Sequence, residues 1–95
     1  MLKTSDLIQE RKQTHGPWKT QATIAQTLKA ILRNGVVMRN TAGQDKISPE
    51  QLEALEMILV KVSRIVCGNA SEPDHWADIQ GYAELGKAGD HPDAK

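Results

Sequence analysis

The chain has 95 residues, with twelve basic and twelve acidic side chains and a formal net charge of +0. This length predicts one domain with a modest core, and part of its apolar surface can remain for a partner subunit. The balanced charge argues against a protein dedicated to nucleic acid, which usually carries a basic excess on one face. We therefore expect no direct nucleic-acid binding.

Cysteine usage and hydropathy indicate the compartment. Cys67 is the single cysteine, so it cannot form an internal disulfide, which fits a reducing interior. No apolar run approaches the roughly 20 residues of a membrane span. The first residues also lack the basic, apolar and small-residue order of a signal peptide. We expect a cytoplasmic protein that does not engage a membrane.

Helix signals begin near the N-terminus. A first short helix is predicted over residues 5–13, capped by Thr4 or Ser5 and ended at Gly16 in a left-handed conformation. A second is predicted from Pro17, a favourable first helical position, to about Arg33.

The second helix carries apolar residues at helical spacing, and a turn pair follows it. Asn34-Gly35 is expected to end it. Residues 34–47 are predicted to form either an ordered loop over the core or a mobile lid, and a short strand is an alternative with no evident partner.

The third helix has the clearest start signal. Ser48 is an N-cap, Pro49 occupies the first position and Gln51 the capping-box position. The helix is predicted to run to Val66 or Cys67. One predicted seam consists of Leu52, Leu55, Leu59, Val62 and Val66.

Two apolar residues of the third helix lie away from that seam. At 100° per residue, Val60 lies roughly opposite it and Met57 well to one side. A helix that is apolar nearly all round is buried on both sides, which four short helices cannot easily achieve. We therefore predict an all-α, four-helix bundle completed by oligomerisation, as a homodimer or a dimer of dimers.

A fourth helix is predicted over residues 72–85, ended by Gly86. Trp76 shares an apolar face with Ile79 and is expected to anchor this helix in the core. Residues 87–95 are predicted to form a frayed tail, so that residues 1–86 make up the single domain.

Four acids form the candidate metal site. Asp74 and Asp78 are four residues apart, and Glu53 and Glu56 three apart, so each pair shares a helix face. Carboxylate oxygens on successive helices are what magnesium requires. The simpler interpretation is that Asp74 belongs to a helix cap and that the other three are solvated surface charges.

Three basic residues accompany these acids. Lys61 is flanked by valines, so it must either extend to solvent or meet an acid, where it could bind a phosphate as a point charge. Arg64 is more simply explained as a charge that compensates the C-terminal dipole of its helix. A single histidine before a glycine, as His15 is before Gly16, is usually a loop residue. No cluster of Cys or His residues accompanies it, so we do not expect a zinc site.

Four blocks, in order, resemble a group of small phage and prophage proteins of unassigned function. The match spans about residues 5–85. The blocks read Glu10-Arg11-x-x-Thr14-His15-Gly16-x-Trp18, Ile24-Ala25-Gln26-x-Leu28-Lys29, Glu53-Ala54-Leu55-Glu56-Met57-Ile58-x-Val60-Lys61-x-x-Arg64-Ile65 and Asp74-His75-Trp76-x-Asp78-Ile79-x-Gly81-Tyr82. More distantly, the chain is similar to the all-α nucleoside triphosphate pyrophosphohydrolases of the MazG type. Those proteins are helical dimers or tetramers.

The MazG resemblance implies a set of roles. Those enzymes hold magnesium with Glu-x-x-Glu on one helix and Glu-x-x-Asp on the next. Glu53 and Glu56 match the first motif; Asp74 and Asp78 stand for the second, with a spacing of four rather than three. An alternative alignment keeps Glu10 as one of the acids.

The resemblance thus implies metal ligands at Glu53, Glu56, Asp74 and Asp78. Glu53, Glu56 and Asp78 would be catalytic, and Lys61 and His15 would bind substrate. A magnesium-activated water would cleave a nucleoside triphosphate into a monophosphate and pyrophosphate.

A different class of function accounts for the same acids. The chain could be a non-catalytic helical phage accessory protein that binds a host or phage protein, its acids serving as caps and surface charge. Nucleotide binding without turnover is a third, minor alternative. Release of pyrophosphate from a nucleoside triphosphate discriminates among them.

Overall fold

The computed structural model describes residues 4–88, and over this range the chain is entirely helical with no strand. The helices are α1 (Thr4–His15), α2 (Trp18–Thr41), α3 (Pro49–Cys67) and α4 (Pro73–Ala88). The prediction of an all-α chain with four helices is confirmed.

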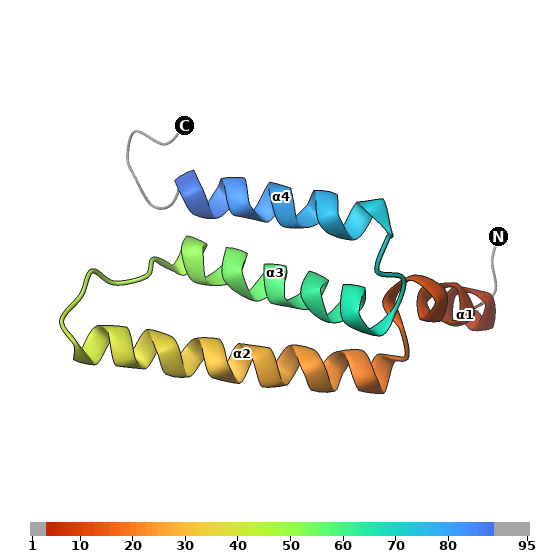
Figure 1. The fold of residues 1–95 in the computed structure, drawn as a ribbon, viewed down its shortest axis with the longest axis horizontal. Helices are drawn as coiled ribbons and strands as arrows, with labels where there is room; N and C mark the ends of the chain where they lie inside the picture. The colour runs from red at the N-terminus through yellow and green to blue at the C-terminus, as the bar shows by residue number, and fades with distance from the viewer. Residues whose placement is uncertain (1–3, 89–95) are drawn as a thin grey trace.

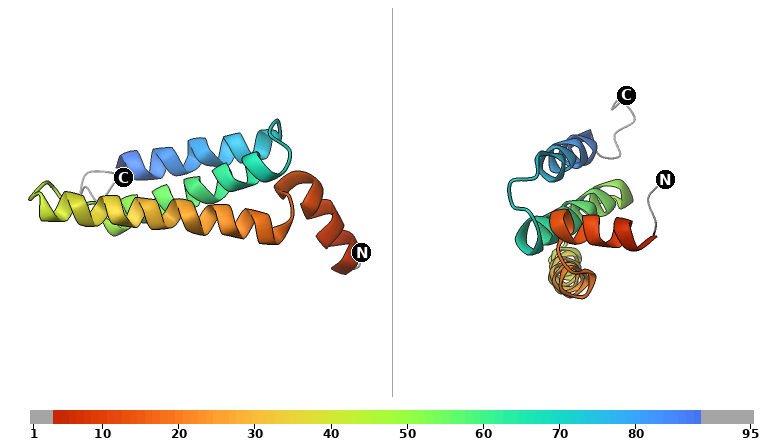
Figure 2. Two further views of the ribbon diagram at one scale, coloured as in Figure 1. Left: turned by 60° about the horizontal axis from the view of Figure 1, so that its bottom comes forward. Right: turned by 90° about the vertical axis from the view of Figure 1, so that its right-hand side faces the viewer.

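Helix α3 is the centre of the arrangement. It packs against each of the other three helices, whereas α2 and α4 do not pack against each other. Figure 1 shows α2 and α4 flanking α3, and Figure 2 shows α1 crossing the end of this layer. The described part of the chain is therefore an open layer rather than a closed bundle.

Helix α2 extends beyond its predicted end. It passes through Asn34 and Gly35 to Thr41, so the predicted end at Arg33 and the predicted loop over residues 34–41 are wrong. Glycine inside a helix costs only about 1 kcal/mol relative to alanine, too little to stop a ladder of hydrogen bonds. The ladder continues until the Ala42 N–H, which donates to the Met38 carbonyl at 3.0 Å.

Helix α3 begins as predicted. The Gln51 N–H donates to Ser48 Oγ at 3.1 Å, and the Ser48 N–H donates to Gln51 Oε1 at 3.0 Å. This reciprocal capping box satisfies two N–H groups that the first turn leaves without helical partners. The same helix ends at Cys67, before Gly68.

Helix α4 is longer than predicted at its C-terminal end. It runs through Gly86 to Ala88, so Lys87 and Ala88 belong to the helix rather than to a frayed tail. The rest of the predicted tail lies outside the described residues.

The buried residues are small or polar rather than large and apolar. Ala25 and Ala54 are the buried apolar residues of the described chain, and they are accompanied by Gln21, Lys61, Ser63 and His75. The predicted Leu seam is only partly covered, since Leu55 is 37% and Val66 66% exposed. Leu55 borders a hollow that Tyr82 and Ala83 of α4 also line.

Trp76 is not the core anchor that the sequence predicts. It is 53% exposed, and its indole N–H donates to the Ala70 carbonyl at 2.8 Å. Helix α4 instead turns His75 inward, with Ile79 and Tyr82 half-buried one and two turns later. Within residues 4–88, no helix is long and apolar enough to cross a membrane.

Candidate functional site

Two glycines bring the N-terminal corner of the chain against the end of α3. Gly16 adopts φ +83°, and a Cβ on it would overlap the Cys67 carbonyl group. A Cβ on Gly68 would overlap the backbone of Thr14 and His15. Only glycine permits this approach without a shift of the backbone, and the approach places Thr14 and His15 beside α3 and α4.

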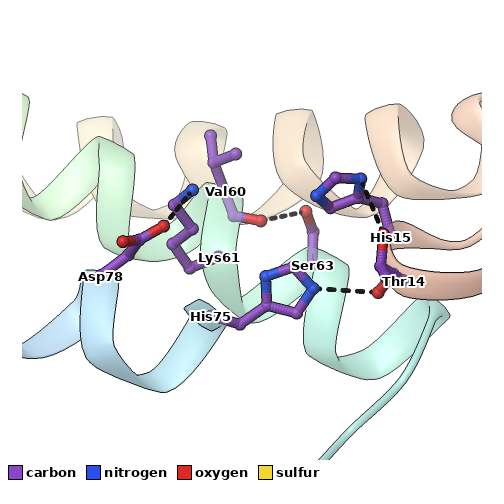
Figure 3. A network of polar contacts seen from close by, with 7 residues as sticks. All are labelled: Thr14, His15, Val60, Lys61, Ser63, His75 and Asp78. Carbon is purple, nitrogen blue, oxygen red and sulfur yellow. Dashed lines mark hydrogen bonds and ion pairs between the residues drawn. The ribbon is translucent and has the colours of Figure 1, made fainter. Parts of the chain in front are cut away.

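His75 joins α4 to this corner. Its Nε2–H donates to the Thr14 carbonyl oxygen at 2.9 Å, and the Asn69 N–H donates to the same oxygen at 3.1 Å. His75 is only 3% exposed. Figure 3 shows this bond beside the Thr14–His15 pair. Because Nε2 carries the proton in this bond, the imidazole has a defined orientation at the site.

The second histidine lies close to the first. The ring centroids of His15 and His75 are 5.0 Å apart, with an angle of 39° between the ring planes. Partial burial lowers the pKa of His15 below its ordinary value of 6.5, and charge interactions with the basic residues Arg64, His75, Lys61 and Arg11 lower it further. The surroundings of His15 therefore have a positive potential.

Lys61 is a buried cation with one carboxylate partner. Its Nζ lies 2.8 Å from Asp78 Oδ2, and the residue is 8% exposed. The hydrogen bond from Lys61, together with its charge, lowers the pKa of Asp78. The prediction that Lys61 either reaches solvent or meets an acid is resolved in favour of the acid, as Figure 3 shows.

These side chains surround one polar cavity, which we call the acid–lysine cleft. Its volume is about 240 Å³. Its lining residues are Thr14, His15, Lys61, Glu72, Asp74, His75 and Asp78. Four of the predicted site residues (His15, Lys61, Asp74 and Asp78) are thus brought together.

The two acids of α3 are not part of this cleft. Glu56 pairs with Arg33 of α2 at 3.1 Å, on the side of α3 away from Asp78. Glu53 is exposed and lines a separate hollow near Tyr82. Among the described residues, no group of three or more His, Cys, Asp or Glu side chains is arranged to hold a metal ion. The predicted convergence of all four acids on one metal is therefore not found.

The two acids of α4 remain as candidate ligands. Magnesium in nucleotide sites is commonly held by one or two carboxylates together with substrate phosphates, and it keeps several waters. Asp74 and Asp78 fit that requirement in number and type. Lys61 already engages one oxygen of Asp78, which leaves its second oxygen for a cation.

One residue of the cleft, His75, and one residue near it, Arg64, went unrecognised in the sequence. His75 stood between two acids, and its spacing of four and seven residues from Ile79 and Tyr82 was the available signal for an inward position. Arg64 was assigned to dipole compensation. It is half-buried, and its Nε has no hydrogen-bond partner among the described residues.

One sequence family includes all the residues that line the cleft. Residues 1–89 match the profile described as domain of unknown function DUF6378. The chain is a member of this family. The match covers all four helices and every residue that lines the cleft. Neither the curated proteins nor the solved structures contain a match to this chain.

Proposed function

We propose that the chain is a magnesium-dependent nucleoside triphosphate pyrophosphohydrolase that uses the acid–lysine cleft. One observation carries this proposal: a nearly buried lysine, three carboxylates and two histidines line a single cavity. An ion pair that buries an ammonium group, as Lys61–Asp78 does, adds little to stability, because the cost of desolvation offsets the attraction. Such a group is therefore more readily explained as part of a binding site than as a contribution to stability.

Each side chain has a role in this proposal. Asp74 and Asp78 would hold magnesium together with the substrate phosphates. The bound metal would neutralise phosphate charge and lower the pKa of a water. Lys61 is placed to receive a phosphate oxygen as a point charge. His15, with its lowered pKa, is neutral near pH 7 and can accept a hydrogen bond from the substrate or a water.

The similarity to MazG-type enzymes supports the reaction type but not the whole ligand set. Glu53 and Glu56, which that resemblance names as ligands and catalytic residues, lie outside the cleft. The proposal therefore rests on Asp74 and Asp78. We also propose a phage origin, which rests on the separate resemblance to small phage and prophage proteins.

The test is incubation with each nucleoside triphosphate and magnesium, with released pyrophosphate as the readout. Asp74→Asn is the informative variant, because Asp74 makes no ion pair among residues 4–88 and its loss should leave the fold intact. Glu84→Gln, an exposed acid of α4 outside the cleft, is the matched control. Wild type and control should release pyrophosphate, and Asp74→Asn should not.

Asp78→Asn is a less discriminating variant. It removes the partner of buried Lys61 and is expected to destabilise the fold as well as any metal site. Magnesium should stabilise wild type against heat by mass action, and Asp74→Asn should lose that effect. Absence of pyrophosphate release with every triphosphate would reject the enzymatic proposal.

A second candidate is a non-catalytic helical module that binds another protein or a second copy of the chain. It is favoured by exposed apolar side chains on all four helices, including Ile8, Ile31, Leu55 and Leu85. A binding module without catalysis also agrees with the separation of the four acids, since Glu56 pairs with α2 whereas Asp78 pairs with Lys61. Nucleotide binding without turnover would appear as magnesium-dependent binding with no product.

A further inference from the structure

A second cavity lies on the other side of His15, between α1, the start of α2 and the last turns of α3. Its volume is about 350 Å³. Four of its lining residues are basic, and none is an acid. The residues that matter here are Arg11, Lys12, His15, Trp18, Gln21 and Arg64. We call this cavity the basic pocket.

The cations of the basic pocket make no ion pair with an acid among the side chains that the structure describes, namely those of residue 4 and residues 7–88. The ion pairs among the described side chains are Arg33–Glu56 and Lys61–Asp78, and both lie outside the pocket. Arg11, Lys12 and Arg64 therefore lie beyond ion-pair distance of every described carboxylate. Three such charges around one hollow repel each other, and an anion would relieve that repulsion.

Arg64 provides a second, independent observation. It comes from the last turn of α3, and its Nε is buried without an acceptor among residues 4–88. Buried N–H donors nearly always have a partner, and an exception requires an explanation such as a missing ion. A guanidinium group has a planar fork of donors that matches the oxygens of a phosphate.

The electrostatics at His15 agree with this assignment. The pKa of His15 is lowered by partial burial and by charge interactions with four basic residues on three helices. Those residues are Arg64 and Lys61 on α3, His75 on α4 and Arg11 on α1. Three carboxylates, those of Glu72, Asp74 and Asp78, line the acid–lysine cleft together with His15, and Lys61 pairs with Asp78. The field at His15 is therefore positive, as an anion site requires.

Trp18 stands at the rim of the pocket. It is 73% exposed at the first position of α2, directly after Pro17. An exposed indole beside a basic hollow can stack on a flat ring while the cations hold a charged group.

We propose that the basic pocket binds the phosphate groups of a phosphorylated small molecule, with Arg11, Lys12 and Arg64 as phosphate ligands and Trp18 as a stacking surface. This site is separate from the α4 carboxylates and does not require that the chain hydrolyse anything. Inorganic phosphates and nucleotides share the phosphate chemistry, and the experiment distinguishes them.

The first measurement is calorimetric titration of the full chain with inorganic pyrophosphate, without magnesium and at low salt. Saturable binding is expected. Arg11→Gln and Arg64→Gln should each weaken it roughly tenfold, the usual effect of losing one charge-assisted hydrogen bond. The matched control is Lys19→Gln, which removes one positive charge from exposed α2 surface outside the pocket. It should bind nearly as wild type does.

A second measurement follows His15 by NMR. Pyrophosphate should raise the pKa of His15 in wild type, because an anion offsets the positive field, and should raise it less in Arg11→Gln. Comparison of adenosine triphosphate with inorganic triphosphate then tests the stacking surface. Tighter binding of the nucleotide, lost in Trp18→Leu, assigns the site to a base-bearing ligand, and equal binding assigns it to inorganic phosphates.

Several results would overturn the proposal. These are no saturable binding by wild type at millimolar pyrophosphate, wild-type binding by both arginine variants, or an equal loss in Lys19→Gln. Arg11 is exposed, so Arg11→Gln retains the test if Arg64→Gln fails to fold by circular dichroism. Pyrophosphate binding that survives Asp74→Asn separates this site from the acid–lysine cleft.

Discussion

Single residues in this chain are buried for their polar contacts. Lys61 is paired with Asp78, His75 donates to the Thr14 carbonyl, and Ser63 donates to the Val60 carbonyl at 2.6 Å. A buried polar group is tolerated when it is hydrogen-bonded. These contacts join α1, α3 and α4. Because hydrogen bonds are directional and apolar contacts are not, they fix the relative positions of the helices more closely than apolar packing would.

The glycine contact at that corner predicts a mutational effect. Gly68→Ala places a methyl group against the Thr14 backbone, which cannot move independently of α1. We expect destabilisation by about 1–3 kcal/mol, as for overpacking in a tight site. Urea unfolding followed by circular dichroism measures it.

The matched control for that variant is Gly35→Ala. Gly35 lies inside α2, and a Cβ there meets nothing within 4 Å. Alanine should therefore stabilise the helix by up to about 1 kcal/mol. Equal effects of the two substitutions would contradict the close approach of Gly68 to Thr14.

His15 predicts a pH dependence of stability. Its pKa in the folded chain lies below the ordinary 6.5, so the unfolded chain binds more protons between those two values. The stabilisation is fully present above about pH 6.5 and falls as the pH drops through the folded pKa.

Urea unfolding at a series of pH values from 7.5 downward, in a buffer without phosphate, checks this prediction. His15→Gln should flatten the slope over that window. A wild-type stability that rises on acidification through the same window would show that the sign is wrong.

At the scale of helices, local signals decide where α3 begins. Ser48→Ala should cost about 1 kcal/mol, because it removes an N-cap acceptor from the Gln51 N–H. Ser71→Ala is the control, since Ser71 is exposed and its hydroxyl makes no hydrogen bond among the described residues. Thermal unfolding should separate the two variants, and a cost as large for Ser71→Ala would remove the capping explanation.

At the scale of the whole molecule, the open layer leaves apolar surface uncovered. Apolar side chains that stay in water forgo roughly 1.5–3 kcal/mol each, and small domains have little stability to spare. Among the described residues, Ala25 and Ala54 are the buried apolar ones. We therefore predict a homodimer or a dimer of dimers.

The structure shifts the expected interface on α3. The sequence pointed to Met57 and Val60, and both are half-buried within the chain. Leu55 and Val66 are more exposed than Met57 and Val60. They are eleven residues apart, about three helical turns, and so share one face of α3. Val66→Lys should dissociate the assembly, because a buried unpaired ammonium is costly.

Light scattering at micromolar concentration measures the assembly directly. Gln44→Lys, which adds the same charge to an exposed loop, should leave its mass unchanged. A monomeric wild type would refute self-association and would leave the apolar face for a different protein.

The sequence by itself determined the helical class, the number of helices and the start of α3. These follow from residues a few positions apart, such as Ser48 and Gln51, whose interactions are set by helix geometry alone. It misjudged the ends of α2 and α4, because a single Gly35 or Gly86 costs less than the hydrogen bonds that continue through it.

Tertiary structure alone decided which candidate residues meet. The Thr14–His75 bond joins residues 61 positions apart, and it depends on the close crossing at Gly16 and Gly68. Helical spacing told which acids share a face, but not which neighbour that face meets. Glu56 therefore meets Arg33 while Asp78 meets Lys61, because α2 and α4 lie along different sides of α3, and no local pattern encodes that choice.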